Sequence, residues 1–172
     1  MQALTRRILF VLVFSLPALS GQVVAQSPAP APAQPVILTI DGAIAVRNGE
    51  TGARFDAAML DALPIHSFRT WTPWFKQAVT FSGPRLQDVL EAVAAKGKTL
   101  HMVALNDYAV DVPFDDAAGF GPLLARRIDG KVIGVREKGP LFLVYPFDDR
   151  PETRNEVFYA RSIWQLTRIT VR

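Results

Sequence analysis

The sequence predicts an α+β domain in which a mixed sheet carries a few short helices. Short runs rich in β-branched and aromatic residues recur from residue 36 to the C-terminus, and turn pairs such as Asp41-Gly42 and Asn48-Gly49 separate them. Stretches with the apolar spacing of a helix lie among these runs. Because strands and helices do not alternate strictly, we expect this class rather than a doubly wound parallel sheet.

Residues 1–25 have the pattern of a secretory signal peptide. Arg6 and Arg7 form a positive start, residues 8–19 form an apolar core of secretory length, and residues 23–25 offer small side chains for cleavage. We therefore expect export to the periplasm by a cleavable signal peptide, with an uncleaved anchor as the alternative. The apolar segment is short for a membrane span.

Residues 26–35, QSPAPAPAQP, form a Pro/Ala-rich tether that cannot build a core. The remaining residues 36–172 suffice for one domain with its own core. Removal of Arg6 and Arg7 leaves 17 basic against 16 acidic residues, a net charge of +1. This balance, with no basic run, excludes a typical nucleic-acid-binding surface, and the lack of cysteine excludes thiol chemistry.

Helices are expected in three places. Residues 55–63 have helical apolar spacing behind Asp56, and residues 82–96 have an apolar stripe with Ser82 as a cap. A weaker helix follows Pro113 and carries Leu123 and Leu124. Strands are expected at residues 36–40, 43–46, 99–105, 108–112, 131–135, 141–145 and 163–171, with a hairpin turn at Asn106-Asp107.

The stretch from Gly139 to Val171 joins two predicted core strands through a charged segment. Residues 163–171 alternate, with Ile163, Gln165, Thr167, Ile169 and Val171 on one face and Trp164, Leu166, Arg168 and Thr170 on the other, which suits a closing strand with one wetter end. A charged loop between core strands is either a binding edge or a solvated surface.

Two tryptophans, Trp71 and Trp74, flank the restricted dipeptide Thr72-Pro73. They form either a packing plug or a platform for a flat ligand. The two histidines, His66 and His101, lie in no hydrolase or metalloprotease motif, so no nucleophile with its base can be assembled.

Metal-binding patterns are also lacking, since the chain has no paired histidine spacing. Asp115-Asp116 and Asp148-Asp149 have the ligands for a hard cation, but adjacent acids more often cap a helix or face solvent. Gly119-Phe120-Gly121 lacks the third glycine of a dinucleotide-binding loop.

Four runs together resemble a known family. VTFSGPRLQDVLEAV (79–93), LNDYAVDVPFDDA (105–117), GPLFLVYP (139–146) and YARSIWQLTRITV (159–171) resemble, in this order, the molybdopterin-binding domain of sulfite-oxidase-type oxidoreductases. The likeness covers nearly all of residues 36–171, and ARSIWQLTRI is its most specific part. It implies a single domain of that fold.

The sequence departs from these enzymes at the metal site. They hold molybdenum through a cysteine thiolate in the strand and loop that here contain FRTWTPW, and this chain has no cysteine. They also usually carry lysine where Trp164 stands and tryptophan where Gln165 stands.

The chain is therefore most similar to small exported proteins of the same fold that bind a free pterin without metal. The resemblance implies that such a protein reports pterin binding to the periplasmic domain of a membrane-bound sensor, typically one that makes or degrades cyclic di-GMP.

A pterin site needs aromatic faces and a few polar groups that recognise the guanine-like edge of the ring. With the resemblance, Trp164 and either Trp71 or Trp74 would supply the faces. The expected edge-binding residues are Arg161, Ser162, Asp148, Asp107 and Tyr108. Without the resemblance, Trp164 would be a core residue and Arg161 part of a surface ion pair.

Two other function classes remain open from the sequence. One is an enzyme, either a molybdenum-cofactor-dependent oxidoreductase or a cofactor-binding subunit that holds molybdopterin without a thiolate. The other is a ligand-free interaction scaffold whose pocket is filled by its own tryptophans.

Overall fold

The computed structural model describes residues 30–172, so the predicted signal peptide and the first part of the tether lie outside the described residues. Residues 30–35 contain no helix or strand. They are attached to the domain, because the Pro30 carbonyl accepts a hydrogen bond from the Asn48 amide and the Ala33 and Gln34 amides donate to the Asp56 carboxylate.

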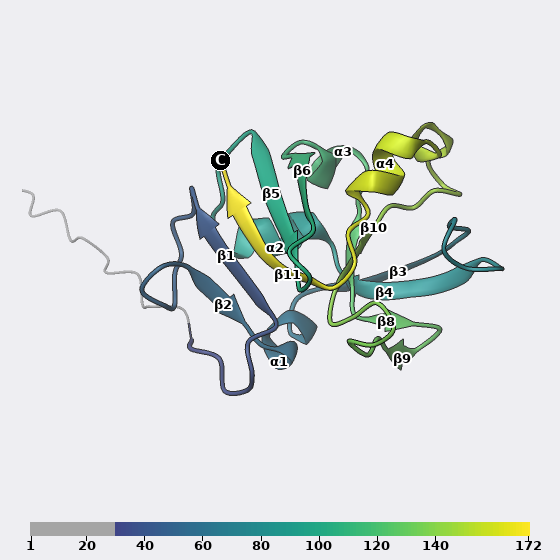
Figure 1. The fold of residues 1–172 in the computed structure, drawn as a ribbon. Helices are drawn as coiled ribbons and strands as arrows, with labels where there is room; N and C mark the ends of the chain where they lie inside the picture. The colour runs from purple at the N-terminus through teal and green to yellow at the C-terminus, as the bar shows by residue number, and fades with distance from the viewer. Residues whose placement is uncertain (1–29) are drawn as a thin grey trace, which may run out of the picture.

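A five-stranded sheet forms one side of the molecule (Figure 1). Its centre is the parallel pair of β1 and β11, and its other neighbours are antiparallel. The order of the strands is β2 (Ala53–Phe55), β1 (Leu38–Gly42), β11 (Leu166–Val171), β5 (Thr99–Ala104) and β6 (Ala109–Pro113).

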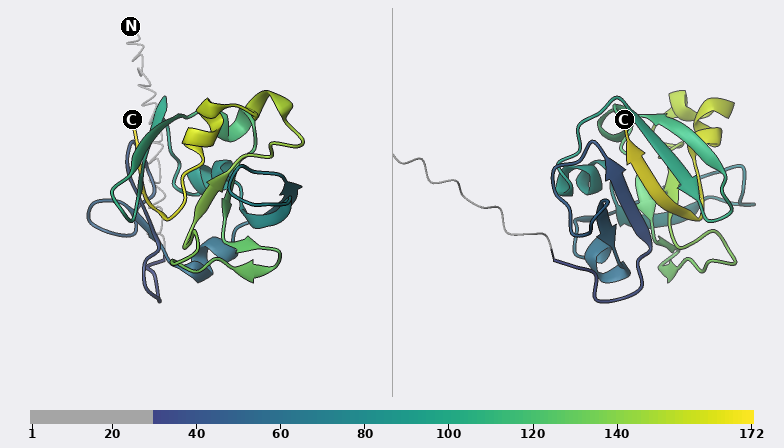
Figure 2. Two further views of the ribbon diagram at one scale, coloured as in Figure 1. Left: turned by 45° about the vertical axis from the view of Figure 1, so that its right-hand side comes forward. Right: turned by 60° about the vertical axis from the view of Figure 1, so that its left-hand side comes forward.

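Two smaller sheets complete the strands. An antiparallel four-stranded sheet contains, in order, β3 (Ile65–Thr70), β4 (Val79–Pro84), β8 (Arg127–Ile128) and β9 (Lys131–Val132). The antiparallel pair β10 (Phe142–Val144) and β7 (Leu123–Ala125) lies between the five-stranded sheet and the β3–β4 hairpin, as Figure 2 shows.

The helices are short. They are α1 (Ala57–Asp61), α2 (Leu86–Ala92), α3 (Asp116–Gly119) and α4 (Glu156–Arg161), with a single 3-10 turn at Pro151–Thr153. The fold is therefore mixed α and β, as the sequence predicts. Within residues 30–172, no helix is long and apolar enough to cross a membrane.

The core lies where the sheets meet. Strand β10 is fully buried, and so are Tyr145 and Phe147, which follow it. Phe142 of β10 packs edge-on against Phe81 of β4, with ring centroids 5.7 Å apart. Strand β10 thus joins the small sheets in one core. The buried strand predicted at residues 141–145 is confirmed.

Several predicted elements are confirmed with shifted bounds. The hairpin at Asn106-Asp107 is present as β5 and β6, and Asp56 caps α1 by accepting from the Met59 amide at 2.9 Å. Residues 43–46 are not a strand, which is a correction: the partner of β1 is β2 at 53–55, beyond the Asn48-Gly49 turn.

The predicted helix at 82–96 is shorter than expected. Ser82 is not its cap, because residues 79–84 continue as β4 and pair with β3. Gly83 allows this strand to approach its neighbour: an added Cβ would lie 2.2 Å from the Leu124 carbonyl oxygen. Leu123 and Leu124 are likewise not helical, since they form the buried strand β7.

A β-bulge between Leu166 and Arg168 corrects the predicted alternation of the last strand. The extra residue places Leu166 in the core together with Ile169 and Val171, although strict alternation puts Leu166 on the opposite face from them. Residues 163–165 precede β11 and run beside β10 instead, with the Leu143 amide donating to the Ile163 carbonyl.

The charged segment between β10 and β11 contains a helix that was not expected from the sequence. Asn155 caps α4 by accepting hydrogen bonds from the Val157 and Phe158 amides. The side chains of Phe158 and Tyr159 then pack against the core. One side of α4 thus packs beside β6, while most residues of the segment remain exposed to solvent.

Candidate ligand pocket

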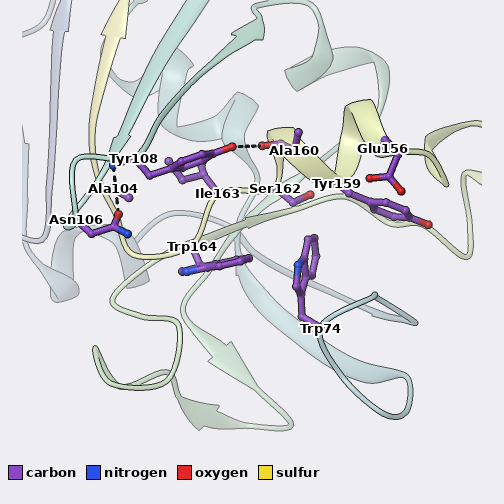
Figure 3. Close-up of a pocket in the computed structure, with 10 residues that line it drawn as sticks. All are labelled: Trp74, Ala104, Asn106, Tyr108, Glu156, Tyr159, Ala160, Ser162, Ile163 and Trp164. Carbon is purple, nitrogen blue, oxygen red and sulfur yellow. Dashed lines mark hydrogen bonds between the residues drawn. The ribbon is translucent and has the colours of Figure 1, made fainter.

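A cavity of about 390 Å³ opens where three segments meet: the β5–β6 turn, the loop after β3, and the stretch from α4 to β11 (Figure 3). Its lining is mostly apolar and aromatic. The lining residues are Trp74, Ala104, Asn106, Tyr108, Glu156, Tyr159, Ala160, Ser162, Ile163 and Trp164. A largely apolar cavity of this size with a few polar groups is typical of a small-molecule site.

Tyr108 forms one wall and ties two of the segments together. It follows Asp107, whose φ of +63° makes the tight turn between β5 and β6. The Tyr108 hydroxyl donates to the Ala160 carbonyl of α4 at 3.3 Å. The hairpin turn and α4 are thus held at a fixed separation across the cavity.

Trp74 forms a second wall and is anchored in the core. Its ring makes tilted or edge-on contacts with Phe142, Phe147, Tyr159 and Trp164, at centroid distances of 5.4 to 6.4 Å. Such contacts contribute beyond the buried area alone. The sequence left two roles open for this tryptophan, a packing plug or a platform for a flat ligand. The structure shows the packing role, and one edge of the ring lies at the cavity.

Trp164 forms the third wall and is not a core residue, since 36% of its surface is exposed. It lies at the crossover from the small sheet to the large one: Trp164 bridges Phe142 of β10, and Gln165 turns the chain with a φ of +54°. In Figure 3 the Trp164 and Tyr108 rings face one another across the cavity.

Three polar side chains line the cavity. Ser162 ends α4 and donates its hydroxyl to the Phe158 carbonyl at 2.9 Å, which leaves its oxygen able to accept. The Asn106 side-chain oxygen accepts from the Tyr108 amide at 3.3 Å, which turns the amide nitrogen outward as a donor. Glu156, in the first turn of α4, forms no ion pair within residues 30–172.

Of the residues expected to bind a ligand, Trp74, Tyr108, Ser162 and Trp164 are brought together at the cavity, and the others are not. Trp71 is 44% exposed and lies outside the lining. Asp148 is engaged by the protein itself: it accepts from the Trp71 amide at 2.9 Å and pairs with Arg154. Asp148 therefore holds the tryptophan loop in place.

Arg161 also points away from the cavity. Its guanidinium pairs with the buried carboxylate of Asp116 at 3.0 Å, and that carboxylate accepts from the Tyr145 hydroxyl at 2.7 Å. Burial, and next the charge of Asp116, raise the pKa of Tyr145. The ion pair expected for Arg161 without a ligand is thus present, with Asp116 buried and Arg161 partly exposed. Asp107 shapes the turn and does not line the cavity.

Six lining residues were not expected from the sequence, and three of them carry polar groups: Asn106, Glu156 and Tyr159. Glu156 and Tyr159 are three positions apart, so they share a face of α4. The signal that identifies this helix is the Asn155 cap followed by apolar Val157 and Phe158.

The donor set does not fit a protein-bound molybdenum. The sequence has no cysteine, and residues 30–172 hold no cluster of three acidic or histidine side chains suited to a metal. His101 bonds Asp111 across the β5–β6 hairpin, as expected of a structural histidine, and His66 lies near Asp88. No basic side chain lines the cavity to hold a phosphate.

The chain matches no protein-family model, and no curated protein sequence aligns with it significantly.

Proposed function

We propose that this protein is a non-catalytic, pterin-binding module that signals the presence of its ligand to a membrane-bound partner. The observation that carries the proposal is the aromatic cavity formed by Trp74, Tyr108, Tyr159 and Trp164. The resemblance to the sulfite-oxidase type of molybdopterin-binding domain adds to it, and that specific fold is part of the proposal.

The shape of the cavity suits a flat ring. The rings of Tyr108 and Trp164 lie on two sides of the open space in Figure 3, and Trp74 closes a third with its edge. A bicyclic heterocycle between the first two would stack on Trp164. Stacking of this kind contributes about 1 to 3 kcal/mol in nucleic-acid sites. The open cavity also favours a ligand over a scaffold whose tryptophans fill the pocket.

The polar groups suit the guanine-like edge of a pterin. This edge presents an amino group beside a ring N–H, and one carboxylate accepts from both. Glu156 is the lining carboxylate, and Asn106 supplies an amide that both donates and accepts. In this proposal Glu156 and Asn106 replace Asp148, Asp107 and Arg161 as the residues that recognise the edge.

The charges favour a free pterin over molybdopterin. Glu156 is the one charged side chain in the lining, and an anionic phosphate beside it would be repelled. With no thiolate in the sequence, an oxidoreductase that holds molybdenum itself is disfavoured as well.

The proposed location and partner rest on the sequence. The signal-peptide pattern at residues 1–25 supports export to the periplasm, and the resemblance supports a sensor that controls cyclic di-GMP as the partner. A binding module of this kind acts through contacts, so ligand binding has to alter a surface that the partner recognises.

Titration of the purified protein with neopterin and 7,8-dihydroneopterin under reducing conditions tests this function. We expect saturable, one-to-one binding of at least one of them, and weaker binding of neopterin monophosphate because of Glu156. Absence of binding to both uncharged pterins would overturn the proposal.

A further inference from the structure

We propose that Lys138 is a positioning residue of the pocket: its ammonium, seated on the back of Trp164, holds the indole as the stacking face, so ligand affinity depends on a positive charge at position 138. This inference rests on the proposed function and deepens it. It concerns a residue outside the cavity that acts through Trp164.

The geometry places Lys138 behind the ring. The Lys138 Nζ lies 4.0 Å from the Trp164 ring centroid, within the range of a strong cation–π contact. Lys138 does not line the cavity, whereas Trp164 does. The ammonium therefore covers the face of the indole that is turned away from the ligand space.

Hydrogen bonds of Gln165 fix the position of Lys138 relative to Trp164. The Gln165 amide donates to the Lys138 carbonyl at 3.0 Å, and the Gln165 side-chain amide donates to the Val135 carbonyl at 2.7 Å. The segment before β10 is thus fastened to the residue that follows Trp164. Lys138 reaches the indole from this fixed position.

The surroundings give the ammonium no competing partner. Lys138 forms no ion pair within residues 30–172, and its second aromatic neighbour, Phe75, is farther away at 6.0 Å. Its charged neighbours in the adjoining groove are Asp129, Lys131 and Glu137. Burial lowers the pKa of Lys138, so the cation–π contact forms in a partly desolvated site where it is strongest.

The consequence for binding is preorganisation. Trp164 is exposed on its cavity face, and its ring makes edge-on contacts with Trp74 and Phe142, so loss of the ammonium uncovers the other face and loosens the stacking position. A ligand must then fix the ring as it binds, and that ordering reduces affinity. Protonated Lys138 orders the ring beforehand.

Neopterin titrations of the full exported protein test this with matched variants. We expect Lys138→Met to lower affinity about threefold to tenfold, Lys138→Arg to restore it, and Lys131→Met, a neighbouring lysine with no aromatic ring beneath it, to have no effect. Equal affinity of the wild type and Lys138→Met would overturn the inference and leave the proposed function standing. Failure of the wild type to bind would overturn both.

A pH series separates charge from packing. Affinity of the wild type should fall as the pH rises through the lowered pKa of Lys138, and Lys138→Arg should lack this step. Titration of the pterin itself appears in both proteins and cancels in the comparison. Identical pH profiles of the two proteins would contradict the inference.

Discussion

Trp74 and Trp164 have ring centroids only 5.7 Å apart, but their surroundings differ. Trp74 packs against three further aromatic rings, Phe142, Phe147 and Tyr159, and belongs to the periphery of the core. Trp164 contacts only Phe142 of these rings, has Lys138 over its indole, and lines the open cavity. The difference teaches that one tryptophan supports the pocket wall and the other is available to a ligand.

Replacement of Trp74 gives the largest expected effect on the fold. We predict that Trp74→Ala lowers the free energy of unfolding by about 2 to 4 kcal/mol, because it removes a large ring from a packed aromatic cluster. Denaturant unfolding measures this. A loss below about 1 kcal/mol would show that Trp74 is not the supporting residue.

Replacement of Trp164 should have the opposite profile. We predict that Trp164→Ala weakens neopterin binding about 10- to 100-fold, as expected for a lost stacking face, with a much smaller loss of stability than Trp74→Ala. Trp71→Ala is the matched control, since Trp71 is similarly exposed but lies outside the cavity. If Trp71→Ala and Trp164→Ala weakened binding equally, the assignment of the stacking face would be wrong.

The same contrast applies to two charged residues of α4. Arg161 is enclosed with Asp116 and Tyr145, whereas Glu156 faces the cavity without an ion pair in the described chain. We predict that Arg161→Met destabilises the protein by about 1 to 3 kcal/mol, because the Asp116 carboxylate stays buried without its cation. Glu156→Gln should leave stability unchanged and weaken binding. Thermal unfolding and neopterin titration of both variants test these two expectations.

The smallest expected effect is a decrease in the free energy of unfolding at alkaline pH, caused by Tyr145 beside the Arg161–Asp116 pair. Burial and Asp116 raise the pKa of Tyr145, so the folded state keeps the phenol neutral while the unfolded state ionises near pH 10. The neutral phenol does not reduce the free energy of unfolding below pH 10. Above pH 10 that free energy decreases, by about 0.8 kcal/mol at pH 10.5. Unfolding curves of the wild type and Tyr145→Phe from pH 8 to 10.5 measure this decrease. If the unfolding free energies of the two proteins changed in parallel with pH, the prediction would be contradicted.

The sequence predicts the local features and misses those made by long-range packing. The hairpin at Asn106-Asp107 and the short helix behind Asp56 follow from short motifs, and both are confirmed, the helix with shorter bounds. The bulge after Leu166 and the burial of Leu124 in β7 depend on neighbouring strands, which no local pattern contains.

The candidate site shows the same limit. Trp74, Tyr108, Ser162 and Trp164, which the resemblance singled out, lie at the cavity. Asp148 and Arg161 were expected there too, but their charges are engaged by Arg154 and Asp116, partners 6 and 45 residues away in the sequence. Whether a charged group is engaged inside the protein depends on tertiary contacts.

Mass analysis of small molecules extracted from the purified exported protein, with molybdenum quantified in the same sample, tests the central claim most directly. The proposed function predicts a pterin without phosphate and without stoichiometric molybdenum. Stoichiometric molybdenum with molybdopterin would contradict it and restore the oxidoreductase. A protein that carries no pterin and also fails to bind added 7,8-dihydroneopterin would contradict it in favour of a scaffold.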